Sequence, residues 1–110
     1  MFTIGPLSEY PNEGIYEVKL QGQAFLLIKH NNQYYCVEDK CGHFGMPLAK
    51  GKVKDTKIYC PVHNISFDLN NGQVVNHMGE DCEPIRALKV IEKDEILFCS
   101  DGSAADQFNR

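Results

Sequence analysis

The stretch Cys41-Gly42-His43-Phe44-Gly45-Met46-Pro47-Leu48, with Cys60-Pro61-Val62-His63 further along, decides how this chain folds and what chemistry it supports. Each stretch offers one thiolate and one imidazole, and the second pair is spaced one residue wider than the first. Two cysteines with two histidines are the ligands that a [2Fe–2S] centre requires when histidine replaces cysteine on one of its two irons. The sequence therefore predicts a metal centre bound by Cys41, His43, Cys60 and His63.

Two alternative assignments of these residues stay open. The first is a tetrahedral zinc site, because zinc is commonly bound by two cysteines and two histidines. The single residue between Cys41 and His43 is tighter than ordinary zinc-finger spacing, and no helix is predicted to present His63, so zinc is disfavoured. The second is chance proximity of buried residues. It is disfavoured because both pairs stand among glycines and prolines, which are typical of a built loop.

The bulk composition is that of one ordinary soluble domain. The chain has 110 residues, of which 43% are hydrophobic and 24% charged, and no apolar run approaches the length of a membrane-spanning helix. Its net charge of −4 disfavours nucleic acid and anionic membranes as partners. An odd number of cysteines and the lack of a signal-peptide pattern favour a reducing, cytoplasmic location. We expect a monomer in which residues 1–100 form the domain and 101–110 a polar tail.

Short strand patterns recur along the chain, and helix patterns are nearly absent. Residues 14–20 alternate apolar and polar side chains, as in a half-buried strand, and 24–28 and 33–37 read as a hairpin. Further strands are predicted over residues 57–60, 65–68, 73–75, 85–91 and 95–99. This spacing predicts an all-β fold, an antiparallel sandwich or barrel. Residues 41–67 are expected to form a cluster-binding subdomain of loops and short strands on that framework.

The two ligand stretches, with Phe67-Asp68 before Gly72, resemble those of the Rieske ferredoxins. The resemblance extends over nearly the whole domain, to about residue 99. It implies the Rieske fold and one [2Fe–2S] cluster per chain. By this resemblance the inner iron is bound by Cys41 and Cys60, and the outer iron by His43 and His63.

The resemblance also implies a low reduction potential. High-potential Rieske proteins carry an extra cysteine in each ligand loop, joined as a disulfide, and a serine and a tyrosine hydroxyl that donate hydrogen bonds to the cluster. The corresponding residues here are Met46, Val62, Ile65 and Phe67. Because each missing donor leaves the reduced cluster less stabilised, we expect a potential near the bottom of the Rieske range.

A small Rieske ferredoxin is an electron-transfer protein without catalytic residues of its own, so the resemblance implies a carrier rather than an enzyme. We expect single electrons to pass from a flavin-dependent ferredoxin reductase to a terminal oxygenase, both bound transiently. An oxygenase is disfavoured, since only His30 and His77 remain for its second iron site. Two alternatives stay open: a Rieske-like small subunit of a larger reductase, such as assimilatory nitrite reductase, and a non-redox zinc-binding interaction module.

The remaining cysteines and a lysine-rich stretch need separate interpretation. Cys36, Cys82 and Cys99 fall in or beside strand patterns, so we expect them to be ordinary buried residues. Cys36 is five residues before Cys41, so it could pack beneath the cluster.

The stretch between the ligand pairs forms either a solvated hairpin or a docking surface for an acidic partner, of which we favour the hairpin. Its lysines are Lys50, Lys52, Lys54 and Lys57.

Overall fold

The structure is a computed structural model that describes residues 2–40, 47–61, 65–76 and 83–100. Among these residues every regular element is a β-strand, except the short 3-10 helix η1 (Leu7–Glu9). All pairings between these strands are antiparallel. The predicted all-β antiparallel architecture is therefore confirmed. No helix in the described part of the chain is long and apolar enough to cross a membrane.

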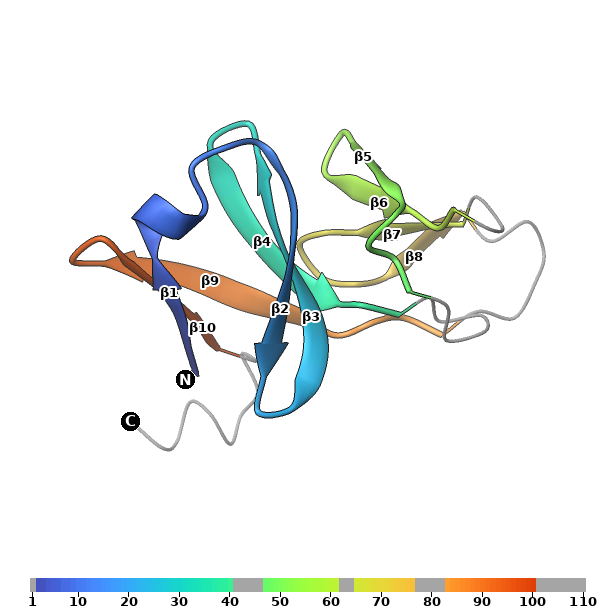
Figure 1. Cartoon of the computed structure of the whole chain (residues 1–110). Coiled ribbons are helices and arrows are strands. Elements are labelled where there is room, and N and C mark those ends of the chain that lie inside the picture. Colours follow the sequence, from blue (N-terminus) through green and yellow to red (C-terminus); the bar gives the residue numbers. More distant parts are fainter. Residues whose placement is uncertain (1, 41–46, 62–64, 77–82, 101–110) are drawn as a thin grey trace.

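Six strands form the larger sheet, in the order β1-β10-β9-β4-β3-β2. They are β1 (Phe2–Pro6), β2 (Gly14–Leu20), β3 (Gln23–His30), β4 (Gln33–Glu38), β9 (Ala87–Lys93) and β10 (Ile96–Ser100). Strands β4 and β9 join the two halves of the sheet through only two residue pairs, Cys36 with Leu88 and Val37 with Ala87. Figure 1 shows the halves crossing at a wide angle, so that the sheet forms a half-barrel.

Four short strands form a second sheet at one side of the half-barrel (Figure 1). They are β5 (Lys52–Lys54), β6 (Lys57–Tyr59), β7 (Ser66–Asp68) and β8 (Val74–Asn76). This sheet falls almost entirely within the stretch expected to form the cluster-binding subdomain. Only β8 lies beyond residue 67 as a whole strand.

Each strand predicted from sequence corresponds to an observed one, with bounds within two residues. Two strands were not predicted, β1 and β5. Strand β1 ends in Gly5 and Pro6 and carries an irregular register after Thr3, features that a strand tolerates only at a sheet edge. Strand β5 is only three residues long and two of them are lysines, so it lacks an apolar signal.

The hairpins turn through residue pairs with positive φ, the conformation that matches the twist of antiparallel strands. Asn31 and Asn32 connect β3 to β4 with φ of 53° and 64°, and Asp94 and Glu95 connect β9 to β10 with φ of 54° and 64°. The second turn was expected at residues 92–94. Strand β9 instead continues to Lys93, because the pairing with β10 begins at Ile96.

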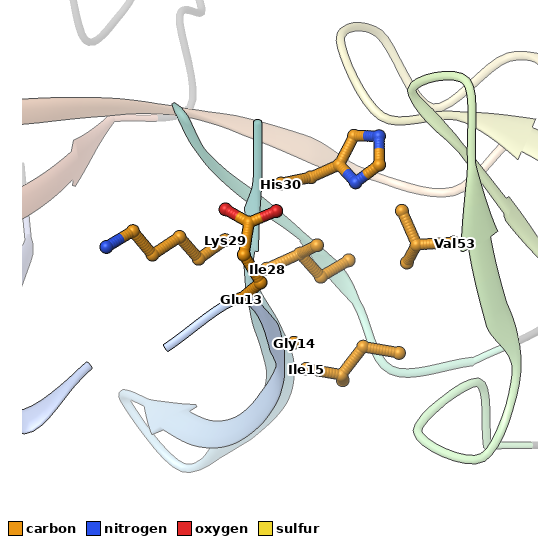
Figure 2. Close-up of a pocket in the computed structure, with 7 residues that line it drawn as sticks. All are labelled: Glu13, Gly14, Ile15, Ile28, Lys29, His30 and Val53. Carbon is orange, nitrogen blue, oxygen red and sulfur yellow. The ribbon is translucent and has the colours of Figure 1, made fainter. Parts of the chain in front are cut away.

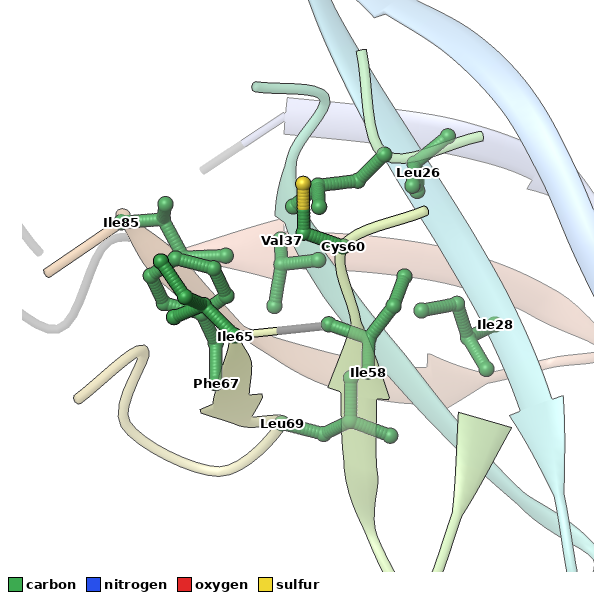
Figure 3. Close-up of a cluster of buried hydrophobic side chains, with 10 residues drawn as sticks. Leu26, Ile28, Val37, Ile58, Cys60, Ile65, Phe67, Leu69 and Ile85 are labelled. Atoms are coloured by element: carbon green, nitrogen blue, oxygen red, sulfur yellow. The ribbon is translucent and has the colours of Figure 1, made fainter. Parts of the chain in front are cut away.

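Buried side chains form two separate core clusters, one on each side of strands β3 and β4. The first lies between the half-barrel and the small sheet and is made of Leu26, Ile28, Val37, Leu48, Ile58, Cys60, Ile65, Phe67, Leu69 and Ile85 (Figure 3). The second lies within the half-barrel and is made of Leu20, Phe25, Cys36, Leu88 and Cys99. Because strand residues alternate between faces, the continuous apolar run of β3 serves both clusters.

The same alternation corrects one expectation. Val37 belongs to the first cluster together with Cys60, so its neighbour Cys36 points to the opposite side and joins Cys99 in the second. A position of Cys36 beneath the cluster site is therefore wrong. The predicted burial of Cys36 and Cys99 is confirmed, since neither side chain is exposed to solvent. Cys82, His77 and the tail 101–110 lie outside the described residues.

Candidate metal centre

Cys60 is the one predicted ligand that the described residues include. It follows directly after β6, and its side chain is only 2% exposed. Figure 3 shows its sulfur at one end of the first core cluster, with Val37 and Ile58 close by. Cys41, His43 and His63 lie outside the described residues. The Cys60 side chain is therefore almost fully buried against an apolar core, which suits a thiolate ligand to iron better than a reactive surface thiol.

The second ligand loop is closed at its base by a backbone hydrogen bond. The N–H of Cys60 donates to the carbonyl of Ile65 over 2.7 Å. This bond continues the β6–β7 ladder one step past the pair Tyr59–Ser66, so that Cys60 and Ile65 form the last rung before the loop. The segment 61–64, which contains His63, therefore starts and ends at adjacent points of one hairpin.

The first ligand loop is closed by a side chain. Asp39 Oδ1 accepts hydrogen bonds from the backbone N–H groups of Leu48, at 2.8 Å, and Ala49, at 3.1 Å. These contacts join the two ends of the segment 40–47, which contains Cys41 and His43. Leu48 is fully buried in the same cluster as Cys60, so both loops are anchored on one core.

Glu38 fixes the strand end from which the first loop departs. Glu38 is 5% exposed, and its carboxylate accepts hydrogen bonds from the Arg86 N–H at 2.7 Å and from Gln23 Nε2 at 3.0 Å. Its own N–H donates to the Arg86 carbonyl at 2.9 Å. Sequence reasoning missed both Glu38 and Asp39. The available signal was an acidic pair directly before a ligand motif, since short acidic side chains readily accept backbone N–H bonds at a turn.

A glycine allows the two ligand-bearing segments to approach each other. A Cβ atom at Gly51 would lie 2.2 Å from the Tyr59 carbonyl oxygen and 3.0 Å from that of Leu48. The Gly51 N–H donates to the Leu48 carbonyl at 2.8 Å. Any larger residue at position 51 would therefore push the turn after Leu48 away from Tyr59, the last residue of β6 before Cys60.

The two cysteines of the second core cluster do not compete as ligands. The hydrogen bond with Cys99, together with burial, raises the pKa of the Cys36 thiol. The same hydrogen bond lowers the pKa of the Cys99 thiol, so the two thiols are partners of each other. Both cysteines lie in a different cluster from Cys60.

A hollow of about 370 Å³ between the two sheets is a separate feature (Figure 2). Its lining comprises Glu13, Gly14, Ile15, Ile28, Lys29, His30 and Val53. Two of its charged groups are already used within the fold. Glu13 accepts the N–H bonds of Asn31 and Asn32, at 2.8 and 3.1 Å, which lower the pKa of its carboxyl. Lys29 Nζ donates to the Pro11 carbonyl at 2.9 Å. The hollow therefore does not compete with the Cys60 region as a reactive site.

Comparison with known proteins identifies the family to which this chain belongs. The sequence profile of the Rieske [2Fe-2S] domain matches residues 1–100. The chain belongs to this family. The Rieske domain binds one [2Fe–2S] cluster per chain, and its donor set of two cysteines and two histidines is present here. The buried thiol of Cys60, on an apolar core shared by the bases of both ligand loops, fits such a cluster.

Relatives of this Rieske domain include both long proteins and small ferredoxins. Mouse apoptosis-inducing factor 3 is 30% identical over 96 residues, which are 87% of this chain but only 16% of that protein. The ferredoxin component of the naphthalene 1,2-dioxygenase/salicylate 5-hydroxylase systems of a Ralstonia species is 25% identical over 69 residues, 63% of this chain and 66% of that protein. This chain thus spans less than a fifth of the mouse relative's length.

A solved structure shares the fold over nearly its full length. The ferredoxin of carbazole 1,9a-dioxygenase from Nocardioides aromaticivorans superposes with a TM-score of 0.78 at 18% sequence identity. The superposition covers 89% of this chain and 94% of that ferredoxin. At this identity the likeness concerns the fold, and the predicted Rieske fold is confirmed by it.

Proposed function

We propose that this Rieske domain is a one-electron carrier that accepts electrons from a flavin-dependent reductase and delivers them to a terminal oxygenase in the cytoplasm. The observation that carries the proposal is the superposition on 94% of the length of an oxygenase ferredoxin. A structure of an oxygenase bound to its ferredoxin also shares the fold, with a TM-score of 0.76. The domain is proposed to act as a monomer that meets each partner transiently.

The proposed cluster ligands are Cys41 and Cys60 on the inner iron and His43 and His63 on the outer iron. When bound, the cluster stores and releases one electron, at a potential that neutral imidazole ligands raise above that of all-cysteine clusters. The chain contributes the apolar surroundings of that chemistry. Ile65 and Phe67 are 1% and 0% exposed, belong to the same core cluster as Cys60, and offer no side-chain hydrogen-bond donor. This supports a low reduction potential.

Transient contact with partners requires a small exposed surface beside the ligands. Pro47 and Pro61 are both exposed and each borders a ligand loop. Weak electron-transfer complexes bury less than about 1,200 Å² in total, so a small docking surface beside these two prolines is enough. Rapid dissociation then allows the carrier to shuttle between the reductase and the oxygenase.

The mouse relative favours a second candidate function. In that protein the matched segment is 16% of a much longer chain. The same domain could therefore work as a redox module permanently associated with a larger polypeptide, as in the small subunit of a larger reductase. The stability of association distinguishes the two functions. A carrier purifies alone at physiological salt, whereas a module copurifies with its partner in a fixed ratio.

Optical and EPR spectra before and after dithionite reduction, combined with metal analysis, test the proposed cofactor chemistry. We expect a red-brown protein that contains iron, bleaches on reduction and gives the low average g-value of a mixed-ligand [2Fe–2S] centre. A colourless protein that contains zinc and no iron would overturn the carrier and establish a zinc-binding interaction module. Reduction by a flavin-dependent reductase, followed by electron delivery to an oxygenase, completes the test.

A further inference from the structure

We propose that the lysine face of the β5–β6 hairpin, defined as Lys50, Lys52, Lys54 and Lys57, is the surface on which an acidic redox-partner protein docks. This inference rests on the proposed carrier function, because it concerns the partner of the same site. It reverses the sequence-based preference for a merely solvated hairpin, on the basis of four observations.

The hairpin register places its charged side chains together on one side. Lys52 lies directly opposite Tyr59, and Lys54 directly opposite Lys57. Directly opposed residues of an antiparallel pair point to the same face. The side chains on one side of this hairpin are therefore those of Lys52, Lys54, Lys57 and Tyr59. The alternate residues Val53 and Ile58 point the other way, Ile58 being fully buried in the first core cluster. The hairpin therefore has an apolar inner face and a basic outer face.

Within the described residues, none of the four lysines forms an ion pair. The ion pair found there joins Lys40 to Glu38. Asp68 on β7 lies opposite Lys57 without forming an ion pair with it. Its Oδ1 instead accepts a hydrogen bond from the backbone N–H of Asn70 at 2.7 Å. Like charges directly opposed across two strands destabilise a sheet, so the pair Lys54–Lys57 is unfavourable for folding. Sequences commonly violate such local rules at functional sites.

The charge of the hairpin opposes that of the whole chain. Residues 50–57 contain four lysines and one aspartate, a local charge of 4 − 1 = +3, while the chain as a whole carries −4. A basic face on an acidic protein orients the molecule in the field of a partner and raises the rate of productive encounters. The complementary surface is acidic.

The lysine face also adjoins the proposed route of the electron. A hollow of about 270 Å³ is lined by Lys50, Gly51, Lys52, Tyr59, Cys60 and Pro61. A carboxylate-rich partner held by Lys50 and Lys52 would thus contact Pro61, directly after a proposed inner-iron ligand. Binding on this face therefore brings the redox centres of the two proteins close together, as electron transfer requires.

The first experiment measures the charge that an oxidant experiences near the cluster. The reduced protein is mixed in stopped flow with ferricyanide, an anion, or with hexaamminecobalt(III), a cation. Each reaction is run at about 0.01 M and about 1 M ionic strength, where the Debye length falls from about 30 Å to about 3 Å. The test variant is Lys50→Glu with Lys52→Glu. The matched control is Lys89→Glu with Lys93→Glu, which changes the net charge equally at exposed positions on β9 of the other sheet.

At low salt we expect ferricyanide oxidation of the test variant to slow by roughly tenfold and oxidation by the cobalt cation to accelerate. Both effects should nearly vanish at high salt, and the control should change by less than about twofold. Equal slowing in the test and control variants would overturn the proposal, because only net charge would then matter. A protein that is colourless before any oxidant is added would instead contradict the proposed carrier function.

A binding measurement independent of electron transfer completes the test. A fluorescein-labelled glutamate-rich peptide stands for the acidic partner surface, and its anisotropy reports binding. We expect salt-sensitive binding that the Lys50→Glu, Lys52→Glu variant loses and the β9 control retains. Salt-sensitive sedimentation with phosphatidylserine vesicles, lost in the same variant, would assign the face to a membrane and overturn a protein partner.

Discussion

Asp39 holds the backbone N–H of Leu48 at 2.8 Å, and this contact joins two residues that lie nine positions apart on either side of the first ligand motif. Leu48 is fully buried in the core that also contains Cys60. The contact therefore ties the entrance of one ligand loop to the apolar base of the other. It is made by a side chain that is not itself one of the proposed ligands.

Replacing Asp39 by alanine should make the cluster labile. Two backbone N–H groups lose an anionic acceptor, and hydrogen bonds to charged groups contribute about 1.5–3 kcal/mol each. We expect the visible absorption to bleach roughly a hundredfold faster in the presence of a chelator, in line with about 3 kcal/mol for the two bonds together. Asp39→Asn keeps one oxygen acceptor, so its bleaching rate should lie between those of Asp39→Ala and the wild type. Unchanged bleaching in Asp39→Ala would show that the loop closes without this contact.

Cysteine replacements should separate ligand from core cysteines. Cys60→Ser is expected to abolish stable cluster assembly, because metal binding and folding of such a site are coupled. Cys36→Ala serves as the control, since it removes an equally buried thiol from the other core cluster. Iron content per chain is the measurement. Full iron in Cys60→Ser, or loss of iron in Cys36→Ala alone, would contradict the assignment.

Adding a hydroxyl at position 65 should raise the reduction potential. Ile65 is buried beside Cys60 and lacks a side-chain donor. A hydrogen bond that stabilises the reduced cluster by about 1.4 kcal/mol raises a one-electron potential by about 59 mV. We expect Ile65→Ser to titrate above Ile65→Ala by roughly that amount, the two variants differing only in the hydroxyl. Equal potentials of Ile65→Ser and Ile65→Ala would show that a hydroxyl at position 65 does not control the reduction potential.

The charge of Lys54 should reduce the stability of the domain. Lys54 and Lys57 are directly opposed, and a favourable cross-strand pair in place of a repulsive one contributes about 0.2–1 kcal/mol. Lys54→Glu is therefore expected to raise the urea midpoint, with Lys54→Gln intermediate. Slower oxidation by ferricyanide at low salt should accompany this gain. A lower midpoint for Lys54→Glu would mean that the pair is compensated within the fold.

Acid should loosen the β3–β4 turn through Glu13. The N–H groups of Asn32 and Asn31 lower the pKa of this carboxyl, so its support of the turn is present above the unfolded pKa of about 4.3 and disappears as the pH falls through the lower folded value. Amide exchange at Asn31 and Asn32 should therefore be faster in Glu13→Gln than in the wild type at pH about 7. The two should converge in acid. Identical exchange at neutral pH would exclude the carboxylate as the acceptor.

Most of the strands could be predicted because their side chains alternate or form apolar runs between turn residues. Strand β2 was predicted with its observed bounds, since residues 14–20 alternate regularly. Strand β5 was missed because Lys52 and Lys54 conceal its single inward residue, Val53. A strand that short becomes visible only through the partner with which it pairs.

The candidate site was predictable in its ligands but not in its supports. Cysteine and histidine are few and chemically distinctive, so their spacing alone suggested the cluster. The acidic pair Glu38-Asp39 signals acceptors of backbone N–H groups, but no local pattern shows that their partners are Arg86 and Leu48, because the tertiary fold brings these groups together. Which core receives Cys36 depends likewise on pairing across β3, β4 and β9.

The antiparallel pairing of Phe2 with Cys99 sets the two ends of the described chain side by side on neighbouring strands. In Figure 1 both ends lie on the side of the half-barrel away from the small sheet. Extra polypeptide could therefore be fused at either end, or the whole domain inserted into a host protein, while Pro61 and the lysine face stay uncovered. This placement of the two chain ends is thus compatible with both proposed functions, a diffusing carrier and a module within a larger polypeptide.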